Sequence, residues 1–444
     1  MGYKPLGECV ERIIDHRGLT PKKLGGSWSE SGYRALSAKN IKDGLLVQED
    51  AMNLVSEEMY RQWMPEEVKR GDVFITSEAP FGEVLYWDSG EKLVLSQRVF
   101  GLTAKTGVCN SRYLYYWMRS PQFQGELRGR ATGTTVIGLR QPELLKCEVN
   151  LPSLEQQTII ARLLGVIDEK IALNNQINGY LEELAMACFE TALIEESKTV
   201  RFGDIVALED SKRVPLNSRD REARKGPYPY YGATSVMDYV DDYLFDGIRV
   251  LLGEDGTVID SEGRPILQYV WGKYWVNNHA HILASSGEYS LEAIYVALRR
   301  TAINHIVTGA VQMKISQRNL KSLELEMPSP KSVDYLQDLF AAFRSNQDEN
   351  AKLTSLRDAL LPKLMSGEID ISKVDHTQLN SHLSEWLRCS CFLLSDRYTV
   401  ILIALPCALD MPCQVFRLCR LPILSSRFGF RPGRILLRCL SFGR

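Results

Sequence analysis

The densest group of side chains that could do chemistry lies in VNNHAHIL, residues 276–283. His279 and His281 are two residues apart, so in a strand they would share one face and could supply two metal ligands. A metal needs one or two more ligands, and no Cys, Asp or Glu lies close by in the sequence. Alternatively, Asn277, Asn278 and the histidines could hydrogen-bond to base edges or phosphates, or be satisfied internally by neighbouring strands.

Two further segments combine basic, aromatic and small polar residues, namely SGYRALSAKNIKDG at 31–44 and SKRVPLNSRDREARKGPYPYYGATS at 211–235. Arg and Lys neutralise phosphates, whereas Asn, Arg, Ser and Thr bond to base edges, so this mixture is typical of nucleic-acid interfaces. Taken alone, each segment is also compatible with a solvated loop. The candidate DNA-binding residues are Tyr33, Arg34, Lys39, Asn40, Gln97, Arg98, Lys225, Tyr230, Tyr231, Thr234, Ser235, Lys273, Asn277, Asn278, His279 and His281.

Catalytic and cofactor-binding motifs are missing from the sequence. It contains neither a G-x-x-x-x-G-K-[ST] loop nor the Asn/Asp-Pro-Pro-aromatic motif of amino-methyltransferases. LLGEDGTV at 251–258 lacks the third glycine and the helix of a dinucleotide-binding loop, so a turn is the better interpretation. Asp168 and Lys170 resemble the end of a nuclease metal motif, but they lie in a helix-patterned segment where solvated charges are expected. We therefore predict no catalytic residue, no cofactor and no metal in this chain.

The elements that must position these candidates occur twice. Residues 131–153 and 307–329 align without a gap at an offset of 176, and the matched pairs include Thr132 with Thr308, Gly133 with Gly309, Gln141 with Gln317, and Pro152 with Pro328. Earlier in each unit, LGECVERI at 6–13 aligns with FGDIVALE at 202–209 at an offset of 196. The ends of the unit therefore repeat, while the interior differs in length and sequence. This pattern predicts one scaffold that holds two variable inserts.

A long helix is predicted after each copy of the repeated junction. From Glu155 to about Glu195 apolar residues recur at alternating steps of four and three, which is the coiled-coil pattern, and the same phase returns from Leu336. Pro362 and Gly367 are expected to end the second helix. Asn174 and Asn350 occupy equivalent seam positions and are predicted to fix the register of the helix pair. The alternative is a loosely packed globular helix that tolerates Asn.

The predicted fold class is α+β, with two globules separated by two long helices and related by an internal pseudo-two-fold repeat. The inserts read as strands and turns at 71–87 and 248–285, with helix-like stretches at 111–130 and 290–306. Two long helices with matching apolar stripes could bury those stripes against each other.

Composition divides the chain into a body and a tail. Residues 376–444 hold nine Arg, no Lys and three acids, whereas residues 1–375 hold 44 basic and 52 acidic groups. Because the body is acidic, any nucleic-acid contact must come from local basic patches. The tail also holds six of the ten cysteines, and we interpret it as a read-through or frame-shifted extension, with a partner-binding segment as the alternative. The sequence has no secretory signal or apolar run of membrane-spanning length, which predicts a cytoplasmic protein.

The repeated junction also carries a resemblance. TGTT…LPSLEQQTIIARLLGVIDEKIALNNQI resembles the central conserved region of specificity (S) subunits of type I restriction–modification systems, and LRDALLPKLMSGEI at 356–369 resembles their distal conserved region. GKYWVNNHAHIL and the ATGTT that follows an aromatic helix are similar to segments of the same family. The resemblance covers residues 1 to about 373, and the tail is a departure from it.

The resemblance implies two target-recognition domains, at 1–153 and 200–329, which are held apart by antiparallel spacer helices at 154–199 and 330–373. Each domain would read one half of a split, asymmetric site in double-stranded DNA. The helices would dock two methyltransferase subunits, and translocase–nuclease subunits would join for cleavage. S-adenosylmethionine, ATP and Mg are then expected in partner subunits, and this chain would be non-catalytic. The alternatives are an autonomous DNA-modifying enzyme with an unrecognised site and a coiled-coil scaffold unrelated to DNA.

Overall fold

A computed structural model describes residues 2–133, 137–309 and 312–371 of the chain. The chain divides into the units Met1–Lys373 and Val374–Arg444, and the tail predicted from the sequence at 376–444 lies outside the described residues. Among the described residues, no helix is long and apolar enough to cross a membrane. The description that follows concerns the first unit.

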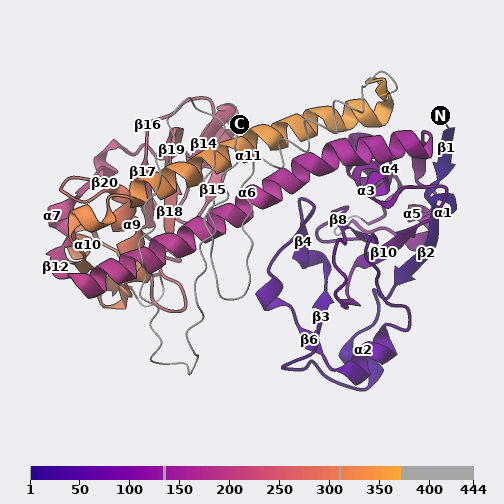
Figure 1. Cartoon of the computed structure of the whole chain (residues 1–444), viewed down its shortest axis with the longest axis horizontal. Coiled ribbons are helices and arrows are strands. Elements are labelled where there is room, and N and C mark those ends of the chain that lie inside the picture. Colours follow the sequence, from indigo (N-terminus) through magenta and orange to yellow (C-terminus); the bar gives the residue numbers. More distant parts are fainter. Residues whose placement is uncertain (1, 134–136, 310–311, 372–444) are drawn as a thin grey trace, which may run out of the picture. The chain divides into compact units, whose positions relative to one another are not determined.

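Two long helices connect the two halves of this unit, and Figure 1 shows them side by side. Helix α6 spans Leu154–Glu195 and helix α11 spans Leu336–Ser366. Ser153 caps α6 because its side chain accepts from the Gln156 amide while the Gln156 side chain accepts from the Ser153 amide. Residues further along α6 contact residues earlier in α11, as Asp168 bonds to Arg357 and Asn178 to Asn346. The helices are therefore antiparallel, as predicted.

The end of α11 differs from the prediction at Pro362. Pro362 lies inside the helix, which continues to Ser366. Gly367 alone ends it, because this residue adopts a left-handed conformation with φ of 78° and its amide bonds to the Leu364 carbonyl. A proline removes one backbone donor and disfavours the helical conformation of the preceding residue, but the buried Leu361 and Leu364 on either side pack the last turns into the hydrophobic core of the N-terminal half.

The first half, here called domain 1, precedes α6. Its elements are β1 (Gly2–Pro5), α1 (Leu6–Cys9), β2 (Val10–Asp15), β3 (Tyr33–Leu36), β4 (Ile41–Lys42), β5 (Leu45–Leu46), β6 (Leu54–Val55), α2 (Glu57–Trp63), β7 (Val73–Thr76), β8 (Val84–Tyr86), β9 (Val94–Leu95), β10 (Val99–Ala104), α3 (Ser111–Arg119), α4 (Pro121–Arg130), α5 (Gln141–Leu144) and β11 (Glu148–Leu151). Its main sheet has the order β2-β10-β7-β8, and β3 pairs with β9 in parallel.

Domain 2 follows α6 and precedes α11 in the sequence. Its elements are β12 (Lys198–Arg201), α7 (Phe202–Ile205), β13 (Val206–Leu208), α8 (Ser218–Ala223), β14 (Lys225–Tyr231), β15 (Val236–Val240), β16 (Phe245–Asp246), β17 (Arg249–Gly253), β18 (Leu267–Val270), β19 (Lys273–Val276), β20 (Ala280–Ser285), α9 (Leu291–Arg300), β21 (Val307–Thr308), β22 (Lys314–Ile315), α10 (Gln317–Lys321) and β23 (Glu324–Met327). Its main sheet has the order β13-β20-β17-β18, and β14 pairs with β19 in parallel.

The two domains repeat each other strand by strand. The first strand of each pairs with the last in the same register, because Gly2 lies opposite Leu151 and Lys198 opposite Met327. These pairs reproduce the sequence offsets of 196 and 176. The interior repeats as well, since β2-β10-β7-β8 matches β13-β20-β17-β18 and the parallel pair β3–β9 matches β14–β19. The inserts, predicted to differ, therefore share one topology and differ mainly in their connections.

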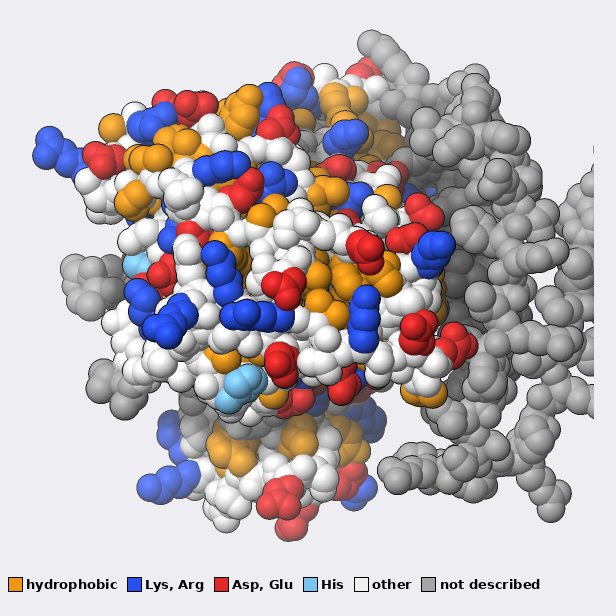
Figure 2. Space-filling model, turned by 90° about the vertical axis from the view of Figure 1, so that its left-hand side faces the viewer, with side chains coloured by type: hydrophobic (Ala, Val, Ile, Leu, Met, Phe, Trp, Pro, Cys, Tyr) orange, Lys and Arg blue, Asp and Glu red, His pale blue; other side chains and the backbone are white. Residues whose placement is uncertain are grey.

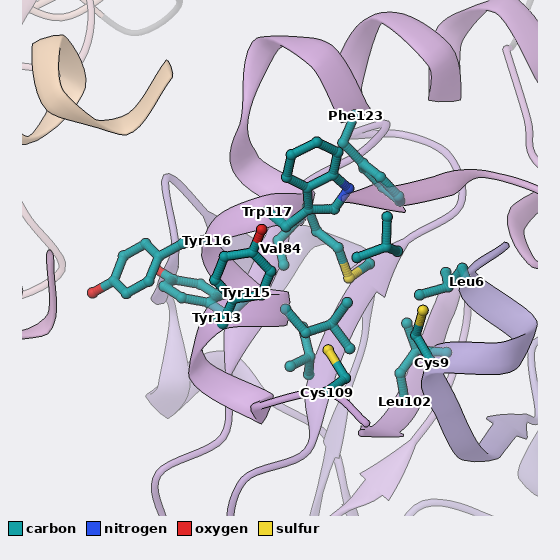
Figure 3. Close-up of a cluster of buried hydrophobic side chains, with 14 of the residues drawn as sticks. Leu6, Cys9, Val84, Leu102, Cys109, Tyr113, Tyr115, Tyr116, Trp117 and Phe123 are labelled. Atoms are coloured by element: carbon teal, nitrogen blue, oxygen red, sulfur yellow. The ribbon is translucent and has the colours of Figure 1, made fainter. Parts of the chain in front are cut away.

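Each domain buries its helix α3 or α9 against its sheet and against both long helices. In domain 1, Figure 3 shows Tyr113 and Trp117 of α3 among a cluster that includes Leu6 and Phe123. Ile160 and Leu164 of α6 and Leu361, Leu364 and Met365 of α11 belong to the same cluster, while Phe189 of α6 and Phe340 of α11 belong to that of domain 2. Because a fully buried large apolar side chain contributes about 1.5–3 kcal/mol, both domains are fixed to the helix pair by these contacts.

Polar anchors add direction to this packing. Asp168 of α6 accepts from the Tyr116 hydroxyl of domain 1 at 2.6 Å and from Arg357 of α11 at 2.9 Å. At the equivalent position of α11, Arg344 donates to the Tyr269 hydroxyl and to Glu292 of domain 2. One helix position in each repeat therefore sets the orientation of its own domain.

Candidate nucleic-acid interface

Four loops of domain 1 meet beyond one end of its strands, and backbone hydrogen bonds join them. The Ser96 amide donates to the Leu36 carbonyl at 2.8 Å, the Ser77 amide to the Arg98 carbonyl at 2.8 Å, and the Leu139 amide to the Ser77 carbonyl at 3.1 Å. We call residues 37–40, 77–79, 96–98 and 137–139 loop cluster 1. Its backbone is held on several sides, which gives its side chains defined positions.

The same bonds recur in domain 2. The Asn277 amide donates to the Tyr231 carbonyl at 3.0 Å, the Glu254 amide to the His279 carbonyl at 2.8 Å, and the Ile315 amide to the Glu254 carbonyl at 2.9 Å. We call residues 232–235, 254–256, 277–279 and 312–315 loop cluster 2. Each of its bonds is the counterpart of one in loop cluster 1, so the chain carries two copies of one surface site.

The exposed polar residues of the two clusters occupy matching positions. The loop with Lys39 and Asn40 follows β3 as the loop with Thr234 and Ser235 follows β14, and Gln97 and Arg98 correspond to Asn278 and His279. Of these, Lys39, Gln97, Arg98, Thr234, Ser235, Asn278 and His279 are exposed. Donors and acceptors of the kind that read base edges therefore stand at the surface of both clusters.

A contact between a basic and an acidic side chain lies at the same place in both clusters. Arg98 pairs with Glu78 at 3.2 Å, and the side chains are 46% and 36% exposed. His279 Nδ1 lies 2.7 Å from Asp255, and these side chains are 46% and 21% exposed. Glu78 and Asp255 follow the equivalent residues Ser77 and Glu254. Such exposed pairs are worth little to stability, at most about 1 kcal/mol, so they can be opened at small cost.

Unusual backbone conformations occur in these loops. Arg98 has a φ of 68° and Ala79 a φ of 38°, in the left-handed region that residues other than glycine rarely adopt. Gly309 of the repeated Thr-Gly motif has a φ of 90°, and a Cβ there would lie 2.1 Å from the Gln312 carbonyl oxygen. The glycine of the repeated junction is therefore required by a tight turn beside the loop cluster. Strained residues of this kind concentrate at functional sites.

Four candidate residues are buried, and for these the predicted contact with DNA is wrong. The Asn40 side-chain oxygen accepts from the amide and the hydroxyl of Ser37 and so closes a short turn. The Tyr230 hydroxyl bonds to the backbone of Leu216. Asn277 accepts from the His279 amide. His281 is 0% exposed and is fully engaged inside domain 2. These residues shape the loops from inside, because their polar groups are used by the protein itself.

His281 belongs to a buried hydrogen-bonded group beneath loop cluster 2. Its Nδ1 lies 2.6 Å from Asp210 and its Nε2 lies 2.9 Å from the Ile315 carbonyl oxygen. Burial raises the pKa of Asp210, but hydrogen bonds from His281 and the Ile282 amide outweigh it and hold this pKa below its usual value. The group ties loop residues 312–315 to the sheet.

The two histidines do not belong to one candidate metal-binding group among the described residues. His279 precedes β20 and pairs with Asp255 at the surface, whereas His281 points into the domain. Asp210, Glu254 and His281 do lie close enough to hold a metal ion. However, Glu254 already binds Arg213 at 2.7 Å, and both His281 nitrogens have protein partners. These donors fit a structural network better than a metal site.

The remaining candidates lie outside the two clusters. Tyr33 and Arg34 lie at the opposite end of β3. The Tyr33 hydroxyl donates to Glu57, and the Arg34 guanidinium donates to both Glu49 and Glu91. Lys225 pairs with Asp238 and Glu222. Lys273 lies over the Tyr243 ring, and Tyr231, half-buried, contributes its carbonyl to loop cluster 2. The structure brings together only the loop residues of the predicted set.

The charge pattern agrees with the acidic body. On the face seen in Figure 2, basic and acidic side chains are interspersed. The acids Glu78 and Asp255 were not among the predicted site residues, although each is the partner of one that was. The sequence gives no direct signal for these two acids. Their partners lie in residues 97–98 and 278–279, which are 181 positions apart, and the repeat offsets of 196 and 176 do not align them.

Between the domains, a polar layer interrupts the helix seam. The Asn174 side-chain amide donates to Asn350 at 2.9 Å and to Glu349 at 2.7 Å, and Asn350 donates to Asn175 at 2.8 Å. Asn174 and Asn350 are buried, and Asn174 Oδ1 is buried without a hydrogen-bond partner. The two predicted register residues therefore meet across the seam. Their role in fixing the register stays a prediction.

Comparison with known proteins points to one family. The family model described as type I restriction modification DNA specificity domain matches residues 29–183 and 194–355. The specificity subunit of the type I restriction enzyme MjaIX from Methanocaldococcus jannaschii is 25% identical over 345 residues, covering 69% of this chain and 79% of that protein. A putative type I restriction enzyme specificity subunit from Haemophilus influenzae is 29% identical over 130 residues, covering 29% of this chain and 32% of that protein.

The fold agrees with this relationship. The crystal structure of a type I restriction–modification system S subunit from M. genitalium matches with a TM-score of 0.51 at 17% identity, covering 82% of this chain and 96% of that one. The family model matches twice, once on each repeat and its helix, as the duplicated topology requires. The chain therefore belongs to the family of type I restriction–modification DNA specificity subunits.

Proposed function

We propose that this chain is the sequence-recognition subunit of a type I restriction–modification complex and reads a bipartite, asymmetric site in double-stranded DNA. The observation that carries the proposal is the presence of two equivalent loop clusters on domains that share one antiparallel helix pair. A rigid spacer fixes the separation of two DNA-reading modules, which in turn fixes the spacing of two half-sites. Because the exposed residues differ between the clusters, the two halves would differ in sequence.

The chemistry of the clusters supports base reading more than tight non-specific binding. Amides, hydroxyls, Lys39, Lys314, Arg98 and His279 are exposed, but Lys314, Arg98 and His279 face acids of the same cluster. Phosphate contacts supply most of the non-specific affinity of DNA-binding proteins. We therefore expect this chain alone to bind DNA weakly, with partner subunits supplying much of the phosphate neutralisation.

The family membership supports a role in assembly. We propose that the outer faces of α6 and α11 dock two methyltransferase subunits and that translocase–nuclease subunits join this complex. S-adenosylmethionine, ATP and Mg would then be bound by these partners, and the chain itself would be non-catalytic. A complex of this kind would act in the cytoplasm, where cellular and invading DNA meet.

The test compares the purified chain with and without a cognate methyltransferase subunit. We expect the chain alone neither to methylate nor to cleave DNA, and the complex to methylate adenine at a defined sequence. Methylation or cleavage by the chain alone would favour an autonomous enzyme. A complex that forms but shows no sequence preference would favour a scaffold, and either outcome would overturn the proposal.

A further inference from the structure

We propose that Gln97–Arg98 and Asn278–His279 are the base-reading dipeptides of the two domains and that they contact equivalent positions of the two half-sites. The inference rests on the proposed function and adds which residues read the bases and which bases they take. The two dipeptides occupy the same place in the duplicated loop clusters, between equivalent backbone hydrogen bonds.

The first argument is position. All four side chains are exposed, while the residues immediately before and after each dipeptide are buried. The Arg98 and His279 carbonyls accept from the Ser77 and Glu254 amides, so the backbone of each dipeptide is fixed before DNA arrives. A site that is held in place by its own domain loses little conformational entropy on binding. Such a backbone can hold a side chain to one base pair.

The second argument is chemical. Gln97 and Asn278 both carry a carboxamide, which pairs with adenine through N6 and N7 in the major groove. Arg98 carries a guanidinium, which pairs with guanine through O6 and N7, whereas His279 can make only one such bond from each ring nitrogen. The half-sites should therefore share an A·T pair at the carboxamide position. They should differ at the neighbouring position, where a guanine is specified in the half-site read by domain 1.

The third argument is the acid beside each basic side chain. Glu78 holds Arg98 and Asp255 holds His279 in the free protein. A guanine can replace Glu78 as the partner of Arg98. Another base leaves Arg98 paired with Glu78, or leaves the acid facing DNA without compensation. The acid therefore penalises the wrong sequence, which is how repulsive elements create specificity.

The experiment uses the full chain in complex with its methyltransferase subunits, and the methylated sites are read by single-molecule sequencing. In Arg98→Ala and Arg98→Lys, we expect discrimination for guanine at one position of one half-site to fall about tenfold to a hundredfold, with the other half-site unchanged. His279→Ala should affect only the other half-site. Arg61→Ala is the matched control, because Arg61 is also exposed and paired with an acid, Glu57, but lies on α2.

A second variant guards against simple loss of folding. Gln97→Asn combined with Arg98→His places the domain 2 dipeptide in domain 1, and we expect it to change the base preference at the positions that the dipeptide reads. A uniform loss of methylation in the Arg98 variants, with unaltered base preference and an unaltered melting temperature, would overturn the proposal. So would an unchanged motif in every variant. If the wild-type complex shows no sequence-specific methylation, the proposed function itself fails, whereas a wild-type motif unaffected by these variants refutes only this inference.

Discussion

Lengthening the helix pair should move the two half-sites apart without changing either of them. The change is one heptad inserted in α6 between Ile171 and Ala172 and one in α11 between Leu353 and Thr354. Both insertions are needed because each long helix contacts both domains. An insertion in α6 alone would force α11 to break either the Asp168–Arg357 bond or the Asn174–Asn350 layer.

The size of the effect follows from helix geometry. Seven residues extend a helix by about 10.5 Å, and a heptad keeps the apolar seam in phase. With about 3.4 Å per base pair, the non-specific spacer should lengthen by at most about three base pairs. Both insertions fall between the Asp168–Arg357 bond and the Asn174–Asn350 layer. The bond stays on the domain 1 side of the inserted heptads, and the layer stays on the domain 2 side. Both reading surfaces should therefore survive intact.

The assay is methylome sequencing of cells that carry the variant with its methyltransferase subunits. We expect both half-sites unchanged and one longer, defined spacer. The insertion in α6 alone is the control and should lower the melting temperature or prevent assembly. A changed base in either half-site, or an unchanged spacer in the paired variant, would refute the conclusion that the helices act as a ruler.

Three further predictions concern the polar contacts. Asn174→Ala should lower the free energy of unfolding by about 1–3 kcal/mol, because Asn350 loses the donor that satisfies its buried carbonyl; denaturant unfolding measures it. Asp168→Asn should cost about 1–3 kcal/mol, because the half-buried Arg357 loses one of its two carboxylate partners and keeps only Asp358; the same assay applies. Asp210 has a lowered pKa in the folded state, so its contribution is complete above about pH 4 and is lost as pH falls through the folded pKa. Melting of wild type and Asp210→Asn across acidic pH should show this difference shrinking.

Matched variants separate these effects from general damage. Asn174→Leu combined with Asn350→Leu should be more stable than Asn174→Ala but should give a heterogeneous spacer if the layer fixes the register. Glu155→Gln, at an exposed site on the same helix as Asp168, should leave stability unchanged within about 0.5 kcal/mol. A stability difference at Asp210 that grows on acidification would contradict its assigned charge state.

The long helices and the repeated ends of the two units could be predicted from the sequence because their signals are local and periodic. The seam of α6 and the meeting of Asn174 with Asn350 follow from spacing and from repetition at a constant offset, whereas the turn at Gly309 was found only in the structure. Pro362 was misjudged because tertiary contacts of the last turns outweigh the preference of proline. Leu356 matches the apolar spacing of the second helix, yet it is 48% exposed, whereas Leu353 and Leu361 are buried.

The site was only partly accessible for a different reason. Residue type suggested Asn40, Tyr230 and His281, but a polar side chain gives no sign of whether it faces solvent or a buried partner. Arg98 and His279 were selected separately, and only the strand register, in which Val99 pairs with Thr76 and Ala280 with Gly253, shows that they are equivalent. That register depends on pairings between strands far apart in the chain, which differing loop lengths conceal in a single sequence.

The measurement that tests the central claim most directly is the methylome of a host that expresses this chain with its methyltransferase subunits. If two equivalent loop clusters read DNA across a fixed helical spacer, the methylated sites should share one motif made of two different specific blocks. A run of unspecified bases of constant length should separate these blocks. A single continuous motif, two identical blocks, or methylation without a motif would contradict the account.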